Sequence, residues 1–160
     1  MSEYDDLLLD AYRGELLGEG FFGALAAQCG DQDRREKLRV LARVEAHTAS
    51  QLRPLVDEAG IDSGDDAAAH DDGVKLAADV TDQPWPELLA SLRAVLPAFL
   101  EKFERLQTIA ADPRDPVLAD LVAHERAIDG FAALELEGHD ADSIDVLRRH
   151  LEAAGSTRTV

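Results

Sequence analysis

The sequence predicts an all-α protein built on four long helices. Apolar residues recur at helical spacing through most of the 160 residues, and no stretch shows the alternating pattern of a β-strand. Hydrophobic residues make up 46% of the chain, which is enough for the buried core of one domain of ordinary size. We therefore expect residues 1–160 to form a single helical domain.

The first half of the chain predicts two helices joined by a short turn. Apolar residues recur at helical spacing over about residues 3–28 and again over about 33–59. Gly30 marks the stop between them, and Asp31 or Asp33 caps the second start, because a carboxylate accepts hydrogen bonds from the free N–H groups of a first helical turn.

The second half repeats this plan after a long connection. Residues 60–83 include the polar run SGDDAAAHDDG, which predicts loops and at most two short helices. A third helix over about 84–111 begins at two prolines, a fourth covers about 115–137, and a short fifth covers 141–154. Two pairs of long helices separated by one long crossover form the ferritin-like arrangement of a four-helix bundle.

Composition excludes several classes of partner. The formal net charge is −17 with only three lysines, so we expect no nucleic-acid surface, because phosphates are bound by lysine and arginine. No apolar run approaches the roughly 18 to 20 residues that cross a bilayer. The acidic N-terminus lacks the basic region of a signal peptide, and the single cysteine excludes an internal disulfide. We therefore expect a cytoplasmic protein that does not bind membranes.

Two glutamates interrupt the apolar stripes of the second and fourth long helices. Glu45 shares one face with Leu38, Leu41 and Leu52, and Glu125 occupies the equivalent place 80 residues later. Side chains three and four apart share a helix face, so we expect both carboxylates to point into the core and to face each other across it. An ionised carboxylate in a core must be paired, hydrogen-bonded or bound to a cation.

The other two long helices add further acidic candidates. Glu15 and Glu19 lie one turn apart on the first helix, and Glu101 and Glu104 lie near the end of the third. Four-helix bundles can hold two metal ions with a Glu from each of two helices and a Glu-x-x-His motif from each of the others. The candidate metal ligands are therefore Glu15, Glu19, Glu45, Glu101 and Glu125.

The chain resembles the ferritin-like superfamily in three segments, YRGELLGEGFFGAL, RVEAHTASQLRPL and LVAHERAIDGFAALELEG. Within that superfamily it looks like the small bacterial proteins near the rubrerythrins and the di-iron tRNA hydroxylases. The resemblance covers about residues 4–137. It implies a centre of two iron or manganese ions that activates oxygen or peroxide for oxidase or hydroxylase chemistry on a small molecule, whose identity it does not give.

The two Glu-x-x-His motifs of such a centre are incomplete. Thr48 and Ile128 stand three residues after Glu45 and Glu125, where histidines are expected. Two hypotheses stay open. In the first, a His-poor site of carboxylates binds hard cations such as Mn, Fe(II), Mg or Ca. In the second, the glutamates form a buried polar layer, hydrogen-bonded to Tyr12, to Thr48 or to each other through water, in a metal-free bundle that serves as a binding or dimerisation module.

Apolar side chains beyond the expected core indicate self-association. Helix faces that carry Phe21, Leu25 and Leu89 exceed what a core of two helix pairs easily covers. Leftover apolar stripes tend to pair with a second copy, so we expect a homodimer.

Overall fold

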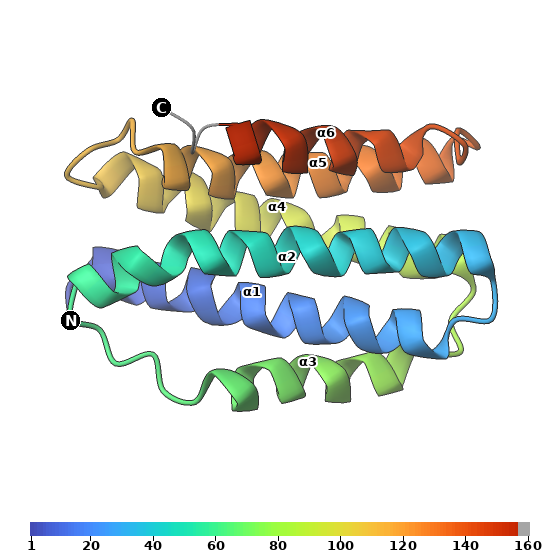
Figure 1. Cartoon of the computed structure of the whole chain (residues 1–160), viewed down its shortest axis with the longest axis horizontal. Coiled ribbons are helices and arrows are strands. Elements are labelled where there is room, and N and C mark those ends of the chain that lie inside the picture. The colour runs from blue at the N-terminus through green and yellow to red at the C-terminus, as the bar shows by residue number, and fades with distance from the viewer. Residues whose placement is uncertain (157–160) are drawn as a thin grey trace. The chain divides into compact units, whose positions relative to one another are not determined.

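The computed structural model describes residues 1–156, and this part of the chain is all helical, as the sequence predicts. Its six helices are α1 (Glu3–Gln28), α2 (Gln32–Glu58), α3 (Asp66–Val80), α4 (Trp85–Ile109), α5 (Pro116–Leu136) and α6 (Ser143–Ser156) (Figure 1). The helices fall into two compact units, Met1–Asp82 with α1 to α3 and a second that begins at Gln83. That the whole chain forms one domain with a four-helix bundle stays a prediction.

The ends of the long helices carry the expected signals. Asp31 caps α2 by accepting a hydrogen bond from the backbone N–H of Arg34 at 2.9 Å, and Ser2 caps α1 in a reciprocal arrangement with Asp5. Gly60 and Gly138 follow α2 and α5 with φ of 68° and 85°, the left-handed conformation that glycine adopts without steric cost. Among residues 1–156, no helix combines the length and apolar character needed to span a membrane.

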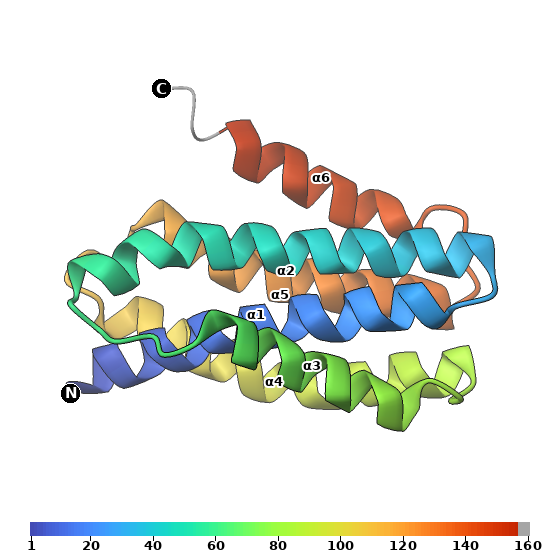
Figure 2. The same ribbon diagram turned by 60° about the horizontal axis from the view of Figure 1, so that its bottom comes forward.

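Helix α3 corrects the expectation of a loop with short helical pieces at residues 60–83. It is one continuous helix of 15 residues that lies along α1 (Figure 2). Asp65 caps its start, and its buried face consists of small residues four apart, Ala69, Gly73 and Ala77. Most positions of the polar run are exposed, because α3 packs its apolar contacts through this narrow face of small residues.

Two glycines allow α1 and α3 to approach closely. A Cβ built on Gly73 would lie 2.8 Å from the backbone nitrogen of Phe21, and one built on Gly20 would lie 3.0 Å from the carbonyl carbon of His70. Such contacts leave no room for a side chain at either position. The packing of α3 therefore depends on backbone contact with α1, which hydrophobic periodicity does not record.

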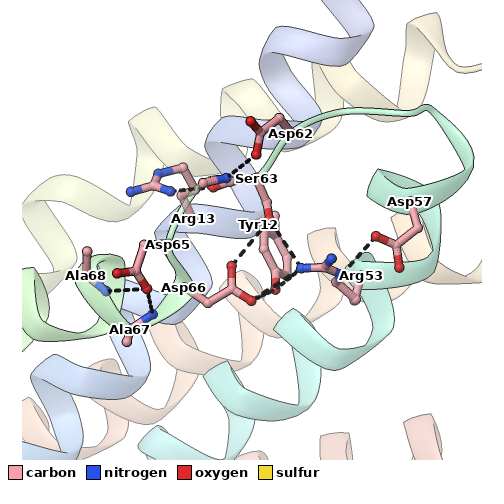
Figure 3. Close-up of polar contacts among 11 residues, drawn as sticks. Tyr12, Arg13, Arg53, Asp57, Asp62, Ser63, Asp65, Asp66, Ala67 and Ala68 are labelled. Carbon is pink, nitrogen blue, oxygen red and sulfur yellow. Dashed lines mark hydrogen bonds and ion pairs between the residues drawn. The ribbon is translucent and has the colours of Figure 1, made fainter.

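A polar cluster ties the start of α3 to α1 and α2 (Figure 3). The hydroxyl of buried Tyr12 donates to Asp66 at 2.7 Å, and Arg53 of α2 reaches both groups at 3.3 Å. Arg53 also donates to the hydroxyl of Ser63, whose carbonyl accepts from Arg13. Burial raises the pKa of Tyr12, so its hydroxyl keeps the proton that it donates to Asp66.

The second unit packs α5 between α4 and α6, since α5 contacts both. Leu89, Leu96, Phe103 and Leu106 form the buried stripe of α4. Glu135 of α5 accepts from the indole N–H of Trp85 at 2.8 Å and from the hydroxyl of Ser143, which joins the starts of α4 and α6.

The apolar side chains from which we expect a homodimer are partly buried within the chain itself. Leu25 and Leu89 are buried, and Phe21 is half-buried in edge contact with Phe22. The exposed large apolar side chains include Val95 and Phe99 of α4, at 48% and 40% exposed. The homodimer stays a prediction.

The polar cluster predicts how α3 is held. Replacing Tyr12 by Phe removes the donor to Asp66, which should lower the free energy of unfolding by about 1 kcal/mol and speed hydrogen exchange along α3. Asp72→Asn, which removes an exposed ion pair with Lys75 on the same helix, is the control and should change stability by less than about 0.5 kcal/mol. Equal exchange in the wild type and in Tyr12→Phe would show that small-residue packing alone holds α3.

Candidate functional site

Helices α1 and α2 bring two buried carboxylates together in the first unit. One oxygen of Glu15 and one oxygen of Glu45 lie within 4.8 Å of each other. Glu15 is only 2% exposed and Glu45 is 6% exposed. Both are candidate metal ligands from the sequence, and their side chains meet although they lie 30 residues apart. Two ionised carboxylates at this distance repel each other strongly where water is excluded.

The stripe that carries Glu45 is buried as the sequence predicts. Its other members are Leu38, Leu41, Thr48 and Leu52, all at most 4% exposed. Helix α2 therefore turns one continuous face inward, and the Glu45 carboxylate is carried there by the periodicity of its neighbours.

Gly18 of α1 makes room for the Glu45 carboxylate. It lies one turn after Glu15, on the same face, and a Cβ built on it would lie 2.8 Å from Cδ of Glu45. The carboxylate of Glu45 is thus seated against the backbone of α1, beside the carboxylate of Glu15. Sequence reasoning missed Gly18 as part of the site, although its i+3 spacing from Glu15 places both on one helix face.

Glu19 does not belong to this group. It is half-buried, and it is not among the grouped ligand atoms. Because Gly18 faces Glu45, the next residue along the helix is turned away by about 100°. Of the two glutamates on the first helix, Glu15 is therefore the one whose carboxylate meets that of Glu45.

The hydroxyl groups expected to satisfy a polar layer donate their protons elsewhere. Thr48 donates to the backbone carbonyl of Val44 at 2.9 Å, and Tyr12 donates to Asp66. A hydroxyl has one proton to give, so neither donates to Glu45. The buried ammonium of Lys37 lies two turns before Glu45 on α2 and pairs with Asp33 at 2.7 Å, toward the helix start and away from Glu45.

The second unit holds another pair of ligand-type groups, on α5. Glu125 is 7% exposed, and its Oε1 lies 3.7 Å from Nε2 of the adjacent His124, which is fully buried. The imidazole of His124 packs on Phe103 of α4 and on His150 of α6, with ring centroids 5.9 and 6.5 Å apart. His150, whose terminal position predicts a solvated ring, is half-buried.

Glu101 and Glu104 are exposed on α4, and Glu104 pairs with Arg126 at 2.8 Å. The buried positions of α4 on either side of them are occupied by its apolar stripe. Whether Glu45 and Glu125 face each other stays a prediction, because they belong to different units.

No family model, curated protein or solved structure matches the chain. The resemblance to the ferritin-like superfamily stays a prediction.

The paired carboxylates predict the sign of a charge-removing substitution. In the presence of a chelator, Glu15→Gln should leave the protein equally stable or raise its free energy of unfolding by about 1 kcal/mol, because it removes the repulsion from Glu45. Glu36→Gln, at an exposed position on α2, is the control and should have little effect. The measurement is urea unfolding followed by circular dichroism. A loss of more than about 1 kcal/mol would mean that the Glu15 charge itself stabilises the fold.

Proposed function

We propose that this chain binds a divalent metal cation through Glu15 and Glu45. The observation that carries the proposal is the meeting of two buried carboxylates from neighbouring helices within 4.8 Å. Carboxylate oxygens lie about 2.0 to 2.6 Å from Mg²⁺ or Ca²⁺, so two ligands of one ion are at most about 4 to 5 Å apart. A cation bound between the two carboxylates would attract both of them and so offset their mutual repulsion.

The nature of the metal follows from the donor atoms and from the resemblance. Carboxylate oxygens favour Mn, Fe(II), Mg and Ca. The resemblance to ferritin-like proteins narrows the proposal to two iron or manganese ions, which when bound would supply oxidase or hydroxylase chemistry on a small molecule. The helix order, two long pairs separated by a long connection, supports a ferritin-like fold.

The remaining ligands of this proposal are supported by sequence alone. Glu125 occupies the same place on the buried stripe of α5 that Glu45 occupies on that of α2. Glu19 or Glu101 would complete the set. Glu19 is half-buried and Glu101 is exposed.

The alternative function is a metal-free helical protein that serves as a binding or dimerisation module. Thr48 and Ile128 favour it, because they stand where the histidines of a complete di-metal motif would be. Elemental analysis of protein purified without chelator separates the two functions directly.

Metal binding predicts a stabilised native state. Adding Mn²⁺ or Fe²⁺ to the apo protein should raise its melting temperature, because a ligand selective for the folded state stabilises it by about 2.7 kcal/mol at a hundredfold excess over Kd. The double variant Glu15→Gln, Glu45→Gln should lose this shift, and the exposed-site control Glu36→Gln should retain it. If no metal co-purifies and the wild type shows no shift, the metal-free function holds.

Gly18 gives a second test that keeps both carboxylates. Gly18→Ala adds a methyl group where the Glu45 carboxylate lies, so it should weaken metal binding by about tenfold, or about 1.4 kcal/mol. The apo protein should not be destabilised much, because Ala favours a helix over Gly by roughly 0.5 to 1 kcal/mol. Gly23→Ala is the matched control, since a Cβ there meets nothing within 4 Å. Calorimetric titration giving equal affinities for both variants would place the metal away from Glu45.

A further inference from the structure

Helix α5 contributes a histidine whose tautomer is fixed by the backbone. Nδ1 of His124 is hydrogen-bonded to the backbone carbonyl of Leu121, one turn earlier on the same helix. A carbonyl oxygen only accepts, so Nδ1 carries the proton in this bond. In the neutral imidazole, Nε2 then carries the lone pair.

This arrangement is the one that metal-binding histidines adopt. A ligating imidazole donates its other ring N–H to a carboxylate, a backbone carbonyl or a water, which fixes both the tautomer and the ring orientation. Here the carbonyl of Leu121 accepts this hydrogen bond, and the rings of Phe103 and His150 pack against the imidazole and restrict its orientation. Nε2 faces Oε1 of Glu125 at 3.7 Å, so nitrogen and oxygen donors are presented side by side.

We propose that His124 is a metal ligand through Nε2, with Glu125 as the neighbouring donor. The inference rests on the proposed function, since it requires that the chain binds a divalent cation, and it adds a nitrogen donor to the ligands. An imidazole nitrogen shifts the preference away from Mg and Ca and toward Fe(II), Co(II) and Zn. The donors on α5 are thus an imidazole and a carboxylate, although the incomplete Glu-x-x-His motifs predict carboxylates alone.

The geometry suggests a variant that separates ligation from packing. The amide of Asn occupies the place of Nδ1, so His124→Asn can still donate to Leu121 but has no atom at the place of Nε2. His124→Gln places its amide near Nε2 instead and is the second variant, should the first fail to fold. His139→Asn, at an exposed position after α5, is the matched control.

The direct test is proton magnetic resonance of the Co(II)-loaded protein. Ligation through Nε2 predicts a strongly shifted, exchangeable signal from the Nδ1 proton in the wild type and in His139→Asn, and its absence in His124→Asn. Calorimetry should show Co(II) affinity reduced by at least about tenfold in His124→Asn, with Mg²⁺ affinity little changed.

The outcomes separate this inference from the proposed function. If Co(II) binds to the wild type without a shifted N–H signal, or binds His124→Asn as tightly as the wild type, the inference on His124 is wrong and metal binding by carboxylates still holds. If the wild type binds none of Co(II), Mn²⁺ and Mg²⁺, both proposals are wrong. The absence of a shifted N–H signal in the Co(II)-loaded wild type would overturn the inference whether or not a variant folds.

Discussion

The burial of two carboxyl groups side by side, Glu15 and Glu45, is the constraint that dominates the first unit. An ionised carboxylate taken out of water loses several kcal/mol of solvation, and a second carboxylate within 4.8 Å adds repulsion. A fold tolerates this where a cation, a proton or a charged partner offsets it. The hydroxyls of Thr48 and Tyr12 are bonded elsewhere, so hydrogen bonding from those two does not offset it.

The same unit is built around close approaches to α1 at two glycines. Gly18 is covered by the Glu45 carboxylate of α2, and Gly20 by the backbone of α3 at His70. Residues two apart on a helix point about 200° from each other, so α2 and α3 lie on opposite sides of α1, as Figure 1 shows. Helix α3 therefore packs against one side of α1, and Glu15 and Glu45 meet on the opposite side. The polar cluster around Tyr12 holds the end of this arrangement in place.

The parts of the fold that were predictable are those specified by short-range patterns. Apolar stripes three and four residues apart gave the long helices, and the Asp31 cap and the glycines after α2 and α5 gave their ends. Helix α3 was not predictable in this way. Its contact face is Ala69, Gly73 and Ala77, which hydropathy scores as nearly neutral, and its packing depends on backbone contact with α1. Such a helix can be recognised only when the position of its partner helix is known.

The candidate site likewise contains residues that were predictable from short-range patterns and residues that only the structure brings out. Glu45 was predictable because a charge on an apolar stripe stands out, whereas choosing Glu15 over Glu19 required the position of Gly18 against α2. His124 was missed because the i+3 rule for Glu-x-x-His assumes that a helix buries one face. Helix α5 contacts both α4 and α6, so its buried arc is wide enough to include positions 124 and 125 together. A helix covered on two sides can therefore offer a histidine and a glutamate from adjacent positions, without the three-residue spacing that a single buried face requires.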